Sequence, residues 1–255
     1  MFSYLSLGMK LYIWVSAFLL GAILGSAMNC LAYRMVRGQK WRGGRSTCPH
    51  CGHVLVAKDL VPILSFLARR GKCAYCGAQL SLRYLLTELL LGVCYVAVVA
   101  RFGFTLNTLT SLVLMTCLFA LSLVDLEIQI IPDRFLMIPA LVRLAQLALE
   151  GRVFQGLMPA LIFGGGLLIL SLAMDKILKK ESMGGGDIKL MAVLGLYFSV
   201  PECLLLVIIA CVIGIVMAKA SEKDGAFPFG PALSLAALAT MLTGEWIVTW
   251  YLNLL

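Results

Sequence analysis

Charged residues are scarce in this chain of 255 residues, and histidine is scarcer still. Only 13% of the residues are charged and 61% are hydrophobic, which is far too apolar for an ordinary soluble domain. Both histidines lie in one cysteine-containing loop, so the sequence offers no strong serine–histidine nucleophile and no histidine-rich site for a catalytic metal. We see no convincing internal repeat and no low-complexity tract. These absences point to an integral membrane protein with few ionisable groups available for chemistry.

The sequence contains several long stretches without charged residues. Several of them approach the roughly 20 residues that a helix needs to cross a bilayer. The pattern predicts an all-α polytopic membrane protein with about eight transmembrane helices, at 11–33, 84–101, 106–124, 134–150, 156–175, 188–199, 202–218 and 228–252. Seven is the alternative, in which 190–218 forms one long helix. The first stretch lacks a clear cleavage site, so we expect a retained helix and not a signal peptide.

The positive charges gather in one loop. Residues 34–83 hold ten of the 21 Lys and Arg residues and a single acid, Asp59. The positive-inside rule places this loop in the cytoplasm, and eight spans then place both termini outside. We interpret the charge as a topology signal and a contact with anionic lipid, and we expect no nucleic-acid partner. The predicted divisions are a first transmembrane helix (1–33), a cytoplasmic loop domain (34–83) and a transmembrane core (84–255).

The same loop contains two CxxC pairs, each followed at once by a glycine. The four cysteines are Cys48, Cys51, Cys73 and Cys76. Four thiolates suit a closed tetrahedral Zn²⁺ site, which leaves no open position for substrate. Disulfides are disfavoured on a reducing cytoplasmic face, and a redox CxxC is the lesser alternative. The sequence therefore predicts a structural zinc that shapes the loop.

Two aspartates at the edges of predicted helices are the leading catalytic candidates. Acids in or beside membrane spans are costly and mark functional sites. In the predicted topology Asp125 ends the third helix and Asp187 begins the sixth, at the same depth on the cytoplasmic side. Such a pair can act as an aspartic-protease dyad, in which one carboxylate activates a water and its protonated partner donates to the scissile carbonyl. An ion transporter is the alternative, but its acids would line a path through the bilayer.

Three glycines, Gly184, Gly185 and Gly186, directly precede Asp187. Glycine permits backbone conformations closed to other residues and lets another chain approach closely. We expect these residues to form a loop by which an extended substrate peptide reaches Asp187. The alternative is a plain turn with Asp187 as the N-cap of the next helix. We expect Lys189 to serve as an anchor at the membrane edge.

Five segments, in order along nearly the whole chain, carry a family resemblance. They are GSAMNCLAYRMVRG (25–38), the cysteine loop with LSLRYLLTELL, LVDLEIQIIPDRF, SMGGGDIKLMAVLG and FPFGPALSLAAL (227–238). Together they resemble the type IV prepilin peptidases, a family of GxGD-class intramembrane aspartyl proteases. The resemblance implies that Asp125 and Asp187 are the catalytic pair, and that the cysteines occupy the family's zinc positions. It implies a bacterial inner-membrane protein whose active site faces the cytoplasm, and a structural or capping role for Asp133.

The resemblance also implies substrates and a second activity. Members cut the basic leader from type IV prepilins and pseudopilins after a glycine, and many then methylate the new N-terminus with S-adenosylmethionine. Members that have the cysteine loop are generally bifunctional, so we expect both activities here. Candidates for the methyl-transfer region are Asn29, Arg34, Asp59 and Glu88, for which packing, snorkelling or capping is the alternative. Two other functions compete with this interpretation. One is a peptidase whose loop is only a scaffold, and the other is a non-catalytic assembly partner.

Overall fold

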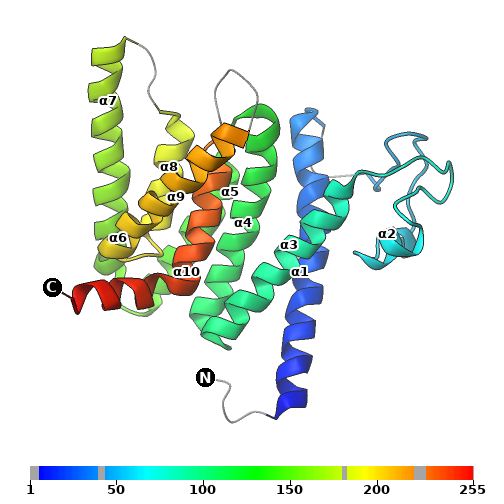
Figure 1. Cartoon of the computed structure of the whole chain (residues 1–255), viewed down its shortest axis with the longest axis horizontal. Helices are drawn as coiled ribbons and strands as arrows, with labels where there is room; N and C mark the ends of the chain where they lie inside the picture. The colour runs from blue at the N-terminus through cyan, green and yellow to red at the C-terminus, as the bar shows by residue number, and fades with distance from the viewer. Residues whose placement is uncertain (1–5, 40–43, 180–182, 221–227, 255) are drawn as a thin grey trace. The chain divides into compact units, whose positions relative to one another are not determined.

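The computed structural model describes residues 6–39, 44–179, 183–220 and 228–254 (Figure 1). The secondary structure of these residues is helical apart from two isolated β-bridges. The chain divides into two compact units, Met1–Phe104 and Thr105–Leu255. The first unit contains α1 (Leu7–Val36), η1 (Ala57–Asp59), α2 (Leu64–Ala68) and α3 (Leu82–Phe102). The second contains α4 (Leu106–Ile128), α5 (Asp133–Leu149), α6 (Val153–Ala160), η2 (Leu161–Gly165), α7 (Gly166–Leu178), α8 (Gly185–Gly195), α9 (Val200–Ala220) and α10 (Gly230–Leu252).

Six helical segments in the described residues are long and apolar enough to cross a membrane. They are α1, α3, α4, the segment Val153–Leu178 that joins α6 to α7, Val200–Lys219 of α9, and α10. The chain is therefore a multi-pass helical membrane protein. All eight predicted stretches are helical, but α5 has 17 residues and α8 has 11. An 11-residue helix spans only about 16 Å of a hydrocarbon layer about 30 Å thick, so the count of eight spans stays a prediction.

The break between α8 and α9 rules out one helix through 190–218. The helix α8 ends at Gly195 and α9 begins at Val200. The single long helix through 190–218 was wrong, since residues 196–199 leave the helix before Pro201. The number of spans, seven or eight, stays a prediction. Proline is tolerated in the first turn of a helix, where its missing N–H has no partner to lose.

In the first unit, glycines let α1 and α3 pack closely. Gly21 and Gly25 are one turn apart, in the small-xxx-small spacing that brings membrane helices together. A Cβ on Gly21 would lie 2.7 Å from the carbonyl oxygen of Leu91, and a Cβ on Gly25 would lie 2.8 Å from that of Thr87. The basic, cysteine-containing loop connects these two helices, although Lys40 and Arg42 lie outside the described residues.

In the second unit, α4 is the most buried of the candidate spans and packs against α5 and α10 (Figure 1). Thr105 and Thr108 form a capping box at its start. It ends at Gln129, whose left-handed backbone returns its N–H to the carbonyl of Asp125 at 2.9 Å. This sharp end places Asp125 in the last turn of the best-buried helix.

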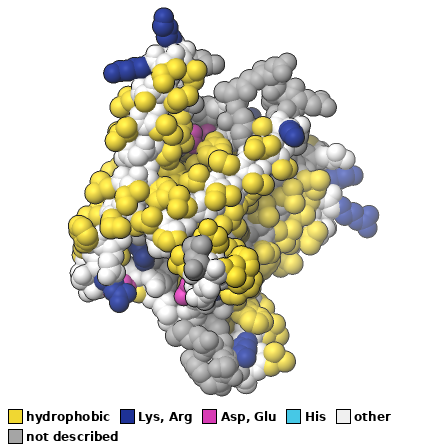
Figure 2. All heavy atoms as spheres, turned by 60° about the vertical axis from the view of Figure 1, so that its left-hand side comes forward, with side chains coloured by type: hydrophobic (Ala, Val, Ile, Leu, Met, Phe, Trp, Pro, Cys, Tyr) yellow, Lys and Arg dark blue, Asp and Glu magenta, His cyan; other side chains and the backbone are white. Residues whose placement is uncertain are grey.

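Exposed hydrophobic side chains cover much of the surface, as a bilayer requires. Figure 2 shows them over most of the face that it presents. On α9 an outward stripe at helical spacing is more than half exposed: Leu204, Ile208, Val212 and Ile215. In water such a surface would be an aggregation site, whereas in lipid it is the ordinary exterior of a spanning helix.

Candidate active site

Asp125 is buried and held by the start of α10. Its side chain is in the last turn of α4, and the residue is 4% exposed. The N–H of Gly230 donates to Asp125 Oδ2 at 3.0 Å. A Cβ on Gly230 would lie 2.6 Å from that oxygen, so no side chain fits at this position without movement. The unpaired N–H groups and positive end of a helix dipole therefore lie beside the carboxyl group.

Asp187 lies half-buried in the first turn of α8. Its Oδ1 is buried and has no hydrogen-bond partner among the described residues. Burial raises the pKa of the Asp187 carboxyl to about 6, and the nearby negative charge of Asp125 adds to the shift. The N-cap of α8 is Gly184 and no side chain caps it, so the alternative of Asp187 as an N-cap was wrong.

The segments that hold the two aspartates meet at one side chain, Ile131. A Cβ on Gly186 would lie 2.9 Å from Ile131 Cβ, and a Cβ on Gly230 would lie 3.5 Å from Ile131 Cδ1. Gly186 directly precedes Asp187, and Gly230 is the donor to Asp125. The end of α4, the start of α8 and the start of α10 thus converge in the second unit.

The three glycines before Asp187 do not form the loop that we expected. Gly185 and Gly186 belong to the first turn of α8, so this stretch is a helix start. None of the three glycines has a positive φ, and the conformational freedom of glycine is therefore not what the described structure uses. The close approach that we expected is present at Gly186, which lies against Ile131.

Asp133 and Lys189 form an ion pair that joins α5 to α8. Lys189 Nζ lies 2.7 Å from Asp133 Oδ1, and both side chains are more than half exposed. The N-cap of α5 is Pro132, so of the structural or capping role expected for Asp133 the structure has the structural one, the ion pair with Lys189. An exposed pair is worth about 0–1 kcal/mol, so it links the two helix starts only weakly.

The four cysteines come together in the first unit. All four Sγ atoms lie within 4.8 Å of one another. Zn–S bonds of about 2.3 Å in a tetrahedron place sulfur atoms about 3.8 Å apart, so the cluster fits Zn²⁺ with small adjustments. Cys48 and Cys73 are buried, whereas Cys51 and Cys76 are exposed.

The two CxxC turns repeat one backbone pattern. The first cysteine of each pair donates its N–H to a carbonyl five residues on, from Cys48 to His53 and from Cys73 to Ala78, both at 2.9 Å. Each first cysteine also accepts from the glycine four residues later, at 2.9 and 3.0 Å. Those glycines, Gly52 and Gly77, have φ of 69° and 71°, a conformation that L side chains rarely adopt. The backbone therefore prearranges both halves of a metal site.

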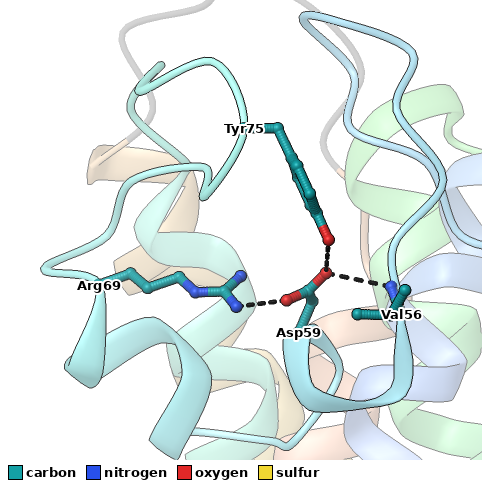
Figure 3. A network of polar contacts seen from close by, with 4 residues as sticks. All are labelled: Val56, Asp59, Arg69 and Tyr75. Carbon is teal, nitrogen blue, oxygen red and sulfur yellow. Dashed lines mark hydrogen bonds and ion pairs between the residues drawn. The ribbon is translucent and has the colours of Figure 1, made fainter.

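Asp59 organises the loop beside these turns (Figure 3). Its carboxylate accepts from Arg69, from the Tyr75 hydroxyl at 2.9 Å and from the Val56 N–H at 3.0 Å. These contacts, with Arg69 the largest, lower the pKa of Asp59 to about 2. Glu88 on α3 accepts from the N–H of Ile63 at 2.6 Å. Both acids thus hold the loop in shape.

A cavity of about 370 Å³ lies in the same unit, bounded by α1, α3 and the loop. Three of the four candidates for methyl transfer line it: Arg34, Asp59 and Glu88. Asn29 is buried but is not among the lining residues. Cys48 and Cys73 of the cysteine cluster line it as well. The sequence did not single out its aromatic side chains, Tyr33, Phe66 and Tyr84.

These features define a class: a multi-pass helical membrane protein with two aspartates at converging helix ends and a four-cysteine cluster that can hold a metal. Family models match both units, as the bacterial Peptidase A24 N-terminal domain over residues 19–102 and the type IV leader peptidase family over residues 112–219. The chain belongs to the type IV leader peptidase family.

Several curated relatives are similar to this chain. A prepilin leader peptidase/N-methyltransferase of Aeromonas hydrophila is 37% identical over 82% of this chain and 75% of its own length. Proteins of the same name from Stutzerimonas stutzeri and Pseudomonas aeruginosa are 31% and 32% identical, over 93% and 92% of both chains. No solved structure matches the chain.

Proposed function

We propose that this protein is a bifunctional prepilin leader peptidase and N-methyltransferase of the bacterial inner membrane. It cleaves the basic leader of type IV prepilins or pseudopilins after a glycine, at the cytoplasmic membrane face, and then methylates the new N-terminus. The peptidase half is supported by two glycines that both lie against Ile131: Gly186, which precedes Asp187, and Gly230, which donates to Asp125. The two aspartates are 62 positions apart in the chain. The names of the curated relatives support both halves.

The surroundings of the two carboxyl groups suit different roles. Asp187 has a raised pKa and an unpartnered buried oxygen, so we assign to it the role of the acid that donates a proton to the scissile carbonyl. Asp125, fixed by the Gly230 N–H, takes the proton from the attacking water. The pair shares one proton, since two adjacent carboxylates do not both ionise readily.

The expected position of the substrate agrees with the position of the pair. A prepilin has a hydrophobic helix that lies in the bilayer, so the junction with its basic leader lies at the membrane edge. Asp125 is in the last turn of a spanning helix, and Asp187 begins a short helix that is not long enough to span. The cytoplasmic orientation rests on the ten basic residues of 34–83.

We assign methyl transfer to the cavity of the first unit. S-adenosylmethionine would supply the methyl group there. Tyr33, Phe66 and Tyr84 offer faces for an adenine ring, and Arg34 and Arg37 offer positive charge for a carboxylate. Zn²⁺ on the four cysteines would hold the loop that forms one wall of this cavity, with no open position for chemistry.

Mass spectrometry of a co-expressed prepilin tests this function. With the wild-type protein we expect loss of the leader and a gain of one methyl group on the new N-terminus. Loss of the leader without the methyl group would leave a peptidase whose cysteine loop is a scaffold. An uncut prepilin, with the protein present in the membrane, would favour a non-catalytic partner or an ion transporter and would contradict the proposal.

A further inference from the structure

Ile131 lies between the two helix starts that lie beside the aspartates. Asp187 is in the first turn of α8, and the first residue of α10, Gly230, donates to Asp125. Ile131 lies against both helix starts, since Cβ atoms built on Gly186 and Gly230 would meet it at 2.9 and 3.5 Å. Its side chain therefore separates the start of α8 from the start of α10.

The residues on both sides of Ile131 restrict its position. On the N-terminal side, Gln129 ends α4 with a left-handed backbone, and its N–H donates to the backbone carbonyl of Asp125 at 2.9 Å. On the other, Pro132 restricts the backbone, and Asp133 pairs with Lys189 of α8 at 2.7 Å. Isoleucine also has few side-chain rotamers, because it is branched at Cβ. A substrate side chain cannot displace Ile131 without loosening one of these contacts.

We propose that Ile131 is the residue that restricts the substrate to glycine immediately before the scissile bond. This inference rests on the proposed peptidase function. The Ile131 side chain already lies close to Gly186 of α8 and Gly230 of α10. A substrate residue with a Cβ before the scissile bond would compete with Ile131 for space, whereas a glycine there would not. Selectivity then comes from steric exclusion of the wrong residue and needs no polar contact with the right one.

Two prepilins that differ only by glycine or alanine before the scissile bond provide the test. The measurement is the ratio of kcat/KM for the glycine substrate to kcat/KM for the alanine substrate. We expect a ratio of about 10 to 200 for the wild-type protein, which is the usual discrimination of one methyl-sized group. We expect Ile131→Ala to lower the ratio about tenfold or more.

Ile130→Ala is the matched control, because Ile130 is the same residue type one position earlier and is 59% exposed. We expect its ratio to equal that of the wild type. An unchanged ratio in folded Ile131→Ala would overturn the inference, as would an equal fall in Ile130→Ala or a wild type that cleaves both substrates alike. If Ile131→Ala is inactive on both substrates, the milder variant Ile131→Val is measured in its place. Removal of one methyl group should lower the ratio, and an unchanged ratio would overturn the inference. A wild type that does not cleave the glycine substrate would instead overturn the peptidase function itself.

Discussion

Asp125 and Asp187 are chemically identical residues in different surroundings. Asp125 accepts an N–H from the start of α10, whereas Asp187 has a buried oxygen without a described partner. The sequence singled out both because acids at membrane edges are rare and costly. It could not single out Gly230 or Ile131, since their roles depend on contacts between residues 55 or more positions apart.

The raised pKa of Asp187 predicts a pH-dependent effect on stability. Its folded pKa of about 6 exceeds the usual unfolded value, so the protonated form is favoured in the folded protein. The contribution of Asp187 to stability is therefore full below about pH 4 and is lost as pH rises through about 6. We expect the stability of Asp187→Asn relative to the wild type to increase from pH 4.5 to pH 7.5. The increase in the free energy of unfolding should be roughly 1–2 kcal/mol after solvent screening.

Thermal unfolding in detergent at several pH values measures this difference. The difference should be smallest below about pH 4, where the Asp187 carboxyl group is protonated in both the folded and the unfolded wild type. A constant difference for Asp187→Asn would mean that its carboxyl group titrates as an ordinary exposed one.

Gly230→Ala tests the close approach of α10 to Asp125. The added Cβ would lie 2.6 Å from Asp125 Oδ2, so the carboxyl group or the helix start must shift. A displacement of a catalytic group by about 1 Å can cost 100-fold in rate, and we expect a fall of at least tenfold in prepilin cleavage. Gly165→Ala, whose Cβ would meet nothing within 4 Å, should cleave at the wild-type rate. Equal rates for both variants would show that this approach is unimportant.

Among the elements, the two CxxC turns were the most predictable and α8 was the least. Cysteine spacing and the following glycines are local, so the sequence alone indicated the four-cysteine cluster that the structure brings together. The bounds of α8 depend on tertiary packing against α5 and α6, and its apolar residues did not distinguish a short buried helix from a span. The glycines before Asp187 were expected in a loop for the same reason.

Loss of one buried ligand should release the metal. We expect about one zinc per chain in the purified wild type, and strong loss of zinc in Cys48→Ser, because three thiolates leave the tetrahedron open. Cys211→Ser on α9 is the matched control, since Cys211 is an exposed cysteine outside the cluster. Elemental analysis gives the zinc content. A wild type without zinc, or full zinc in Cys48→Ser, would contradict the structural metal site.

At the scale of the whole molecule, the candidate sites for the two activities lie in separate units. The cavity and the cysteine cluster belong to Met1–Phe104, and both aspartates belong to Thr105–Leu255. Family models also match the two parts separately. Composition and charge were enough to predict a polytopic membrane protein, because they report on the solvent around the chain. The cavity escaped prediction because its lining comes from helices and loop residues that are distant in sequence.

This separation predicts that one activity survives the loss of the other. Asp187→Asn should fail to cut a prepilin, yet it should methylate a pilin supplied without its leader at close to the wild-type rate. Transfer of a labelled methyl group from S-adenosylmethionine to such a pilin measures this activity. Loss of methyl transfer in a folded Asp187→Asn protein would show that the two activities share a site.

The most direct test of the central claim is the cleavage rate of a prepilin by purified Asp125→Asn and Asp187→Asn variants. We expect each substitution to lower the rate by about a thousandfold or more, because neither half of a proton-transfer pair works alone. Asp175→Asn should cleave like the wild type. Cleavage at near wild-type rates by either of the two variants would mean that the convergence of Asp125 and Asp187 is not the catalytic centre.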